Sequence, residues 1–321
     1  MKSTLELPGA ALAWLGRQGT RAVAALLFIG IALPPLDAAL RPFVSEAIFV
    51  LLTIAFVRVE AAALRGHLRR PALILAATAW TMLIVPSGFG ITCLAIGLDR
   101  SSPDLFLGLM LQAIASPMMS APALAALMGL DAMLVLVTLV VSTALTPLTA
   151  PLFAELFIGP ALTLSPLALG LKLFAVLAGS AFAAIVIRLT AGSDAIRRHR
   201  EKIDGFNILV LFVFVAAVTE NVASEALAHP FRIIGLGALA FLSVFVVLGL
   251  TACAFAKAGR ARAFALALMA SQRNMGLMLA ATGGNLPDLV WLYFALCQFP
   301  IYLLPQLLKP LARRLTRPKA P

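Results

Sequence analysis

Long runs of apolar residues, separated by short polar or basic stretches, cover almost the whole chain. A membrane-spanning helix needs about 20 mostly apolar residues. Dividing the runs at charged residues, Pro and Gly predicts ten such helices, at 22–38, 42–58, 71–97, 104–128, 132–157, 165–187, 205–224, 231–256, 263–283 and 287–308. Strands of a transmembrane barrel would alternate apolar and polar residues, whereas these runs are continuous. The pattern predicts an all-α polytopic protein whose main partner is the lipid bilayer.

The basic residues indicate how the chain is oriented in the membrane. Cytoplasmic loops carry an excess of Lys and Arg. If the N-terminus is cytoplasmic, only Arg41, Arg100 and Arg232 fall in outer segments, Lys172 and Arg273 lie within spans, and every other Lys and Arg is on the inner side. We therefore predict a multi-pass protein of the cell inner membrane with both termini cytoplasmic. The net charge of +11 follows from this placement, so no nucleic-acid partner is expected.

Composition removes several other classes of function. Only 12% of the residues are charged, and the longest polar stretch, 188–204, is too short for a separate domain. The three cysteines, all in apolar segments, are expected to be buried packing residues, and no metal-ligand spacing or cofactor motif is present. The spans contain no paired acids and no Ser–His arrangement, so the chain is not expected to be an enzyme. It also lacks the phosphate-binding loop of an ATP-driven pump.

Ten spans divide into two halves of five, 1–159 and 160–321. Because five is odd, the second half would enter the membrane from the opposite side, which is the topology of an inverted repeat. The fourth span of each half is interrupted. In the first half, Pro117 and Pro122 remove two helical hydrogen bonds. In the second half, four polar residues stand together in an apolar helix, at 271–274. Paired discontinuous helices predict a substrate site near the middle of the membrane.

Arg273 is the most unusual residue within the spans. A charge at the centre of a membrane helix costs roughly 2.5–3.5 kcal/mol, and a guanidinium keeps its proton in proteins. Arg273 could bind an anionic substrate, act as a built-in cation, or be a structural residue bonded to carbonyls. The candidate substrate-binding residues are Arg273, Asn274, Gln272, Ser271, Ser120 and Ser116, with Pro117, Pro122 and Gly276 shaping the backbone. A buried hydroxyl usually bonds to its own helix, which favours a structural role for Ser116, Ser142 and Thr143.

Two stretches of sequence resemble the bile acid:sodium symporter superfamily. The stretch 273–277, Arg-Asn-Met-Gly-Leu, is similar to the family's Gln-Asn-x-Gly-Leu motif. The Pro-rich stretch from Pro117, followed by Thr146-Pro147, is similar to the family's crossover and Ser/Thr-Pro pair. The resemblance implies a panel domain of spans one, two, six and seven, and a core domain of the remaining six. It also implies an organic anion bound at the crossover of spans four and nine and carried inward with sodium as the panel rocks against the core.

The sequence departs from that family where sodium would bind. The resemblance implies a Glu and a Gln in span nine and a Ser-Asn pair in the first crossover, but Met269, Arg273 and Pro122-Ala123 occupy these positions. Met and Ala offer no side-chain oxygen to a hard cation, and Arg repels it. We therefore expect a bacterial-type member that is independent of sodium or coupled differently. A sodium-coupled symporter is one alternative, and a channel or receptor with the same fold is another.

Overall fold

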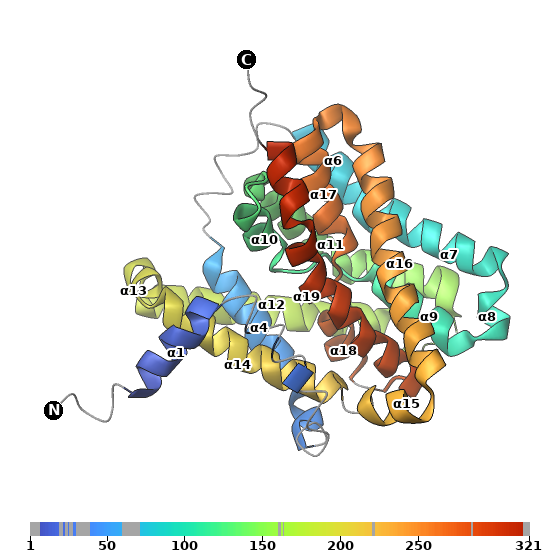
Figure 1. The fold of residues 1–321 in the computed structure, drawn as a ribbon, viewed down its shortest axis with the longest axis horizontal. Coiled ribbons are helices and arrows are strands. Elements are labelled where there is room, and N and C mark those ends of the chain that lie inside the picture. The colour runs from blue at the N-terminus through green and yellow to red at the C-terminus, as the bar shows by residue number, and fades with distance from the viewer. Residues whose placement is uncertain are drawn as a thin grey trace. The chain divides into compact units, whose positions relative to one another are not determined.

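The computed structural model describes residues 7–18, 22, 25, 28, 29, 39–59, 71–159, 162, 164–219, 222–283 and 285–316 (Figure 1). Within this part of the chain the structure is helical, and six helices are long and apolar enough to cross a membrane: Pro71–Ala95, Ala132–Ile158, Pro166–Ala191, Arg200–Ala228, Pro230–Ala254 and Asp288–Leu315. The protein is therefore an all-α protein suited to a membrane. The bounds of these six helices lie within five residues of the corresponding predicted spans, except that the last helix ends at Leu315 and not at residue 308.

The other four predicted spans differ from the long helices in ways that their sequences explain. The span at 22–38 lies almost entirely outside the described residues. The span at 42–58 forms the shorter helix α4 (Val44–Arg58). The other two are each divided into two helices, α9 (Pro103–Ile114) with α10 (Ala121–Leu127), and α17 (Arg260–Ser271) with α18 (Met275–Thr282). Ten spans and the inverted repeat remain predictions.

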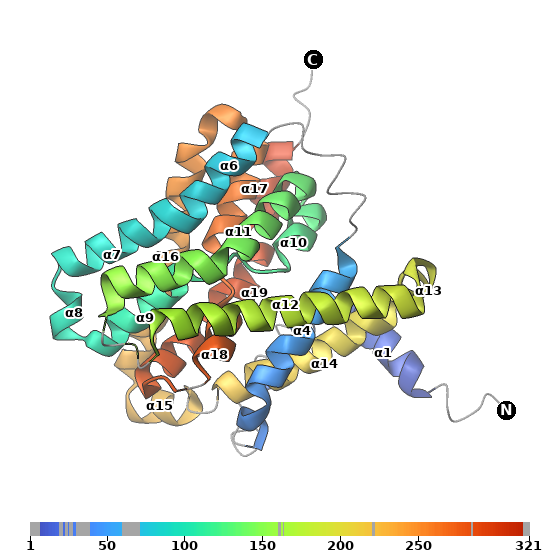
Figure 2. The same ribbon diagram turned by 180° about the vertical axis from the view of Figure 1, so that it is seen from behind.

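The chain forms two compact units, and each combines segments from both halves of the sequence. Unit 1 comprises Met1–Val59 and Val176–Ile233, and unit 2 comprises Glu60–Ala175 and Ile234–Pro321. Unit 1 contains α1 (Leu7–Gln18), α4, most of α12 (Pro166–Ala191), α13 (Ser193–Arg198), α14 (Arg200–Thr219) and α15 (Val222–Ala228). Figure 2 shows the same helices from behind.

In unit 1, helix α1 packs closely along α14. A Cβ atom added to Gly205 would lie 1.9 Å from the carbonyl oxygen of Leu12, so only glycine allows this approach of the two backbones. At the helix ends, Arg17 pairs with Glu201 at 2.8 Å. Arg188 donates to the carbonyls of Val57, at 2.9 Å, and of Val59, beyond the last turn of α4. The first two contacts join α1 to α14, and the Arg188 contacts join α12 to the end of α4, so each links segments that lie far apart in the sequence.

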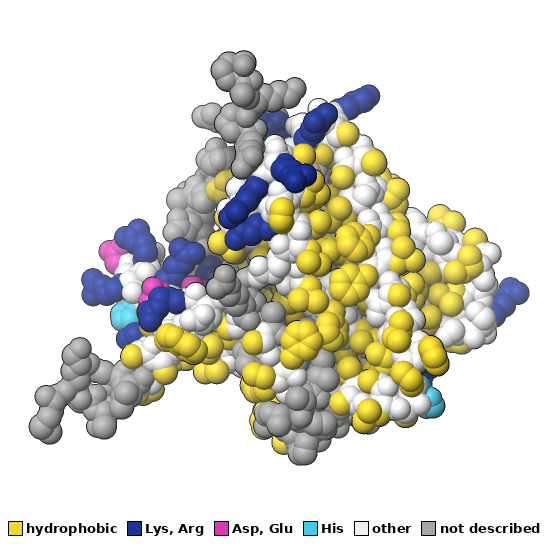
Figure 3. All heavy atoms as spheres, in the orientation of Figure 1, with side chains coloured by type: hydrophobic (Ala, Val, Ile, Leu, Met, Phe, Trp, Pro, Cys, Tyr) yellow, Lys and Arg dark blue, Asp and Glu magenta, His cyan; other side chains and the backbone are white. Residues whose placement is uncertain are grey.

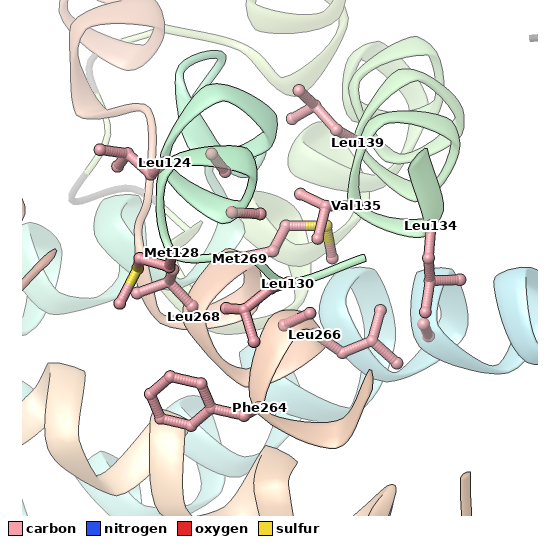
Figure 4. Close-up of a cluster of buried hydrophobic side chains, with 14 of the residues drawn as sticks. Leu124, Met128, Leu130, Leu134, Val135, Leu139, Phe264, Leu266, Leu268 and Met269 are labelled. Atoms are coloured by element: carbon pink, nitrogen blue, oxygen red, sulfur yellow. The ribbon is translucent and has the colours of Figure 1, made fainter. Parts of the chain in front are cut away.

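Unit 2 contains the broken helices and the largest buried cluster. Its other helices are α6 (Pro71–Ala79), α7 (Val85–Ala95), α8 (Leu98–Ser101), α11 (Ala132–Phe153), α16 (Pro230–Ala254) and α19 (Asp288–Thr316). A π-helical turn, Trp80–Ile84, joins α6 to α7, and a second one, Ala154–Ile158, follows α11. Figure 4 shows part of the cluster, where side chains of α10, α11 and α17 gather, among them Leu124, Leu139, Leu268 and Met269. The cluster holds one half of each broken helix against a continuous one.

The surface of unit 2 is as apolar as a lipid-facing surface must be. Large hydrophobic side chains are exposed on its long helices, including Leu75, Ile91, Leu148, Leu167, Ile234 and Leu242. In the space-filling view, hydrophobic side chains cover most of the face of this unit, and Lys and Arg stand at its upper edge (Figure 3). Soluble proteins rarely expose so much contiguous apolar area.

The prediction that all three cysteines are buried is wrong for one of them. Cys93 and Cys297 are buried, whereas Cys253, near the end of α16, is exposed. The physical reason is that an apolar membrane helix has two apolar environments to face. Its side chains can pack inside the protein or point toward lipid, and composition alone does not distinguish these two positions.

Candidate functional site

The two interruptions of helix lie directly against each other in unit 2. Pro117, between α9 and α10, and Arg273, between α17 and α18, form an isolated antiparallel β-bridge. The N–H of Met118 donates to the carbonyl of Gln272, and the N–H of Asn274 donates to the carbonyl of Ser116, each at 2.8 Å. Two backbone segments that leave the helical conformation thus satisfy each other's hydrogen-bonding groups, as buried backbone must.

Local sequence explains why the chain adopts this geometry. Pro117 has no N–H, and it occupies the position of the bridge where none is required, because the two bonds come from Met118 and Asn274. Pro122 lies in the first turn of α10, where an N–H would have no helical partner. The side-chain oxygen of Asn274 accepts from the N–H of Leu277 at 3.2 Å and so caps α18. Gly276 is buried in the first turn of α18.

Four helix ends therefore converge where the breaks pair. Helices α9 and α17 end there, and α10 and α18 begin there. Carbonyls at the C-terminal ends carry partial negative charge, and N–H groups at the N-terminal ends carry partial positive charge. The crossover, defined here as Ala115–Ser120 with Gln272–Asn274, can therefore interact with charges of either sign at different atoms.

Arg273 is held at the crossover by backbone carbonyls. Its side chain is buried, with 4% exposed. One guanidinium nitrogen, Nη1, donates to the carbonyl of Ala115, and the other, Nη2, donates to that of Thr81, both at 3.0 Å. Ala115 caps the C-terminal end of α9, and Thr81 lies in the π-helical turn. No carboxylate among the described residues forms an ion pair with it. Within the described part of the chain, its positive charge is balanced by carbonyl dipoles.

The π-helical turn that supplies the Thr81 carbonyl is anchored on its other side. The indole N–H of Trp80 donates to the hydroxyl of Thr251 on α16 at 2.9 Å, and that hydroxyl donates to the carbonyl of Val247. The ring of Phe255 meets the indole edge-on, with 6.1 Å between the centroids. π-Helical turns rearrange the helical hydrogen bonds and are frequent at functional sites. Here the turn connects α16 to Arg273.

Six polar side chains in unit 2 are buried without hydrogen-bond partners, which is unusual, because buried polar atoms are nearly always paired. Within the described part of the chain, the unpartnered atoms are the hydroxyls of Thr78, Ser116, Ser120, Ser142 and Thr143 and both amide atoms of Gln272. Ser116, Ser120 and Gln272 lie at the crossover. Ser142 and Thr143 lie on α11, which packs against α6, α9 and α17. These groups could bind a polar ligand.

The expectation that Ser116, Ser142 and Thr143 bond to their own helices is wrong for all three. Neighbouring threonines of α11 do form such bonds: Thr138 donates to the carbonyl of Leu134 at 2.8 Å, and Thr146 to that of Ser142 at 3.0 Å. The sequence contains no signal that separates these two groups of hydroxyls. The difference depends on rotamers that tertiary packing selects.

The remaining predicted residues are distributed unevenly around the crossover. The hydroxyl of Ser271 is already used, donating to the carbonyl of Leu268 at 3.1 Å. Met269 is fully buried in the hydrophobic cluster of Figure 4, and Ala123 is exposed on α10. Sequence reasoning identified the crossover residues but not Thr78 and Thr81, because the π-helical turn leaves no recognisable pattern in the sequence.

A buried polar network holds the end of α9 in place. The hydroxyl of Tyr293 on α19 donates to the side-chain oxygen of Gln112 at 2.5 Å, and the amide nitrogen of Gln112 donates to Ser243 on α16 at 3.2 Å. The Ser243 hydroxyl in turn donates to the carbonyl of Ala240 at 2.9 Å. Gln112 lies one turn before Ala115. The network therefore fixes the carbonyl that accepts from Arg273.

Comparison with known proteins adds no family assignment. No protein-family model matches the chain, and no curated protein is significantly similar to it. The class that the fold itself defines is an all-helical, membrane-embedded protein with two broken helices joined at a buried crossover.

Proposed function

We propose that this chain is a secondary transporter that moves a small organic anion across the membrane by alternating access. The observation that carries the proposal is the crossover. Two discontinuous helices meet through backbone hydrogen bonds, and the unpartnered side chains of Ser116, Ser120 and Gln272 lie at the meeting point. Transporters typically bind their cargo between such half-helices near the middle of the membrane.

The chemistry of the crossover favours an anion as cargo. The unpartnered groups at the crossover are the hydroxyls of Ser116 and Ser120 and the amide of Gln272, all of which can donate hydrogen bonds. Arg273 adds one positive charge, and no acid among the described residues pairs with it. A carboxylate or similar oxyanion would accept from these donors and balance the charge. In this proposal Ser116, Ser120 and Gln272 contact the cargo, while Ser142 and Thr143 extend the polar surface along α11.

The resemblance to bile acid:sodium symporters is part of the proposal. It is supported by the division into units, because unit 1 combines the segments of spans one, two, seven and most of six, and unit 2 combines the others. This is the grouping that a panel and a core domain would require. A position in the cell inner membrane with both termini cytoplasmic is likewise proposed from the distribution of Lys and Arg.

The experiment is counterflow in proteoliposomes. The purified protein is reconstituted and loaded with unlabelled pyruvate, benzoate or taurocholate, and uptake of the same labelled anion from outside is followed. A carrier gives a transient accumulation driven by exchange, and Gln272→Ala should weaken it. A steady anion conductance in planar bilayers, without counterflow, would instead identify a channel and contradict the proposal.

A further inference from the structure

The hydrogen bonds of Arg273 bear on cation binding at the crossover as well as on the choice of cargo. Its guanidinium lies between two carbonyl oxygens, of Ala115 and of Thr81, that come from different segments of unit 2. The residue is buried, so water contributes little to solvating the charge. The two carbonyls therefore hold a desolvated cation in the way that a binding site holds an ion.

Both carbonyls belong to backbone that attracts cations. Ala115 ends a half-helix, where the last carbonyls lack intrahelical partners and the helix dipole is negative. Thr81 lies in a π-helical turn, where the regular ladder is rearranged. In secondary transporters, C-terminal ends of half-helices and unwound carbonyls are the groups that bind Na⁺ or H⁺. Here a tethered guanidinium occupies such a place.

A dissolved cation would be repelled from the same place. Arg273 stays charged, because the guanidinium does not release its proton. No acid among the described residues is within ion-pairing distance of it, so no carboxylate there is available to hold a second cation beside the guanidinium. Asp131, at the start of α11, pairs instead with Arg262 at 3.7 Å, and both of these residues lie at helix ends.

We infer that Arg273 is a built-in cation that replaces a dissolved ion at the crossover, so that the site needs no inorganic cation to be complete. In the transport cycle, which rests on the proposed function, the cargo anion then moves without Na⁺. The guanidinium remains on its two carbonyls and acts on the cargo through its field and through the backbone that it positions.

The test uses the thermal stability of the purified protein, which requires no knowledge of the cargo. Melting temperatures are compared in NaCl, KCl, choline chloride and methylguanidinium chloride at equal ionic strength. None of the four salts should selectively stabilise the wild type, and methylguanidinium, a denaturant cation, should if anything lower its melting temperature. Arg273→Ala should melt lower and regain roughly 3 °C when Na⁺ or methylguanidinium fills the space between the carbonyls. Arg273→Gln is the second variant, should the alanine variant not fold.

Arg188→Ala is the matched control. Arg188 also donates to carbonyls at the end of a helix, those of Val57 and Val59, but it is only partly buried. Water can replace it, so no salt should restore its stability selectively. Selective stabilisation of the wild type by Na⁺ would overturn the inference. It would also be overturned if neither Na⁺ nor methylguanidinium stabilised the folded Arg273 variants. Because counterflow is measured separately, failure of the carrier proposal would leave these results interpretable.

Discussion

Pro117 and Arg273, from opposite halves of the chain, face each other across an antiparallel bridge whose two hydrogen bonds are made by their neighbours. This arrangement explains how a proline and a charged residue can lie within the same buried crossover. The proline gives up no bond there, and the arginine side chain is free to reach carbonyls beyond the bridge. Since backbone atoms make the pairing, its strength depends little on the identity of the side chains.

The pairing predicts that cysteines at Ser116 and Asn274 will form a disulfide. In an antiparallel pair, the residues next to a non-hydrogen-bonded position have Cα atoms about 5.5 Å apart, which suits a disulfide. The double variant is made without Cys93, Cys253 and Cys297, with a protease site inserted at Gly192. After oxidation and cleavage, the two fragments should migrate together on a gel until they are reduced.

Each single cysteine variant is the control for this cross-link. Neither should hold the fragments together, because the partner thiol is missing. Complete separation of the fragments from the oxidised double variant would show that the two breaks are not adjacent in the membrane.

The unpartnered hydroxyls predict that removing one of them can weaken cargo binding without lowering the stability of the protein. In Thr143→Val a methyl group replaces a hydroxyl that has no partner, so the melting temperature should stay the same or rise. If this hydroxyl binds cargo, the KM of counterflow should increase roughly five- to tenfold, as expected for about 1 kcal/mol of lost hydrogen bonding.

Thr138→Val is the matched variant on the same helix. Thr138 is equally buried, but its hydroxyl is bonded to the carbonyl of Leu134. Its loss should lower stability by about 1 kcal/mol and leave KM as in the wild type. If Thr143→Val behaved in this way, with lower stability and an unchanged KM, Thr143 would have no part in binding.

The network at the end of α9 predicts that Phe substitutions of the two tyrosines of the chain will change the stability of the protein by different amounts. Tyr293→Phe keeps the ring but leaves the side-chain oxygen of Gln112 buried without its donor. Such an unpaired group costs about 1–3 kcal/mol. Tyr302→Phe removes a hydroxyl that has no hydrogen-bond partner among the described residues, and it should change stability by less than about 0.5 kcal/mol. Denaturation in mixed detergent micelles measures both, and equal effects would rule out the network's role.

Sequence and structure agree best where local chemistry decides the backbone. The continuous helices could be predicted from apolar length, as with Pro71–Ala95 against 71–97, and the two breaks from proline or from consecutive polar residues. The partners of Arg273 could not be predicted. The Thr81 carbonyl accepts from it because a π-helical turn presents that carbonyl to it, and the turn is itself anchored to α16 by the hydrogen bond from Trp80 to Thr251. The hydrogen bonds of the buried hydroxyls on α11 could not be predicted either. Thr138 and Thr146 bond to their own helix, whereas Ser142 and Thr143 do not, and only tertiary packing separates the two pairs.

The contact of α1 with α14 predicts that the smallest possible substitution of Gly205 is destabilising. A methyl group there would lie 1.9 Å from the carbonyl oxygen of Leu12, and rigid backbone cannot yield as a side chain could. Gly205→Ala should therefore lower stability by about 1–3 kcal/mol and displace α1, so that the helical backbone at Arg17 opens to trypsin as the ion pair with Glu201 is lost. Gly237→Ala on α16 meets nothing within 4 Å and should be neutral or slightly stabilising. Melting curves and limited trypsin digestion of both variants measure the effect, and a Gly205→Ala protein as stable and as resistant as Gly237→Ala would show that the helices are not in close contact.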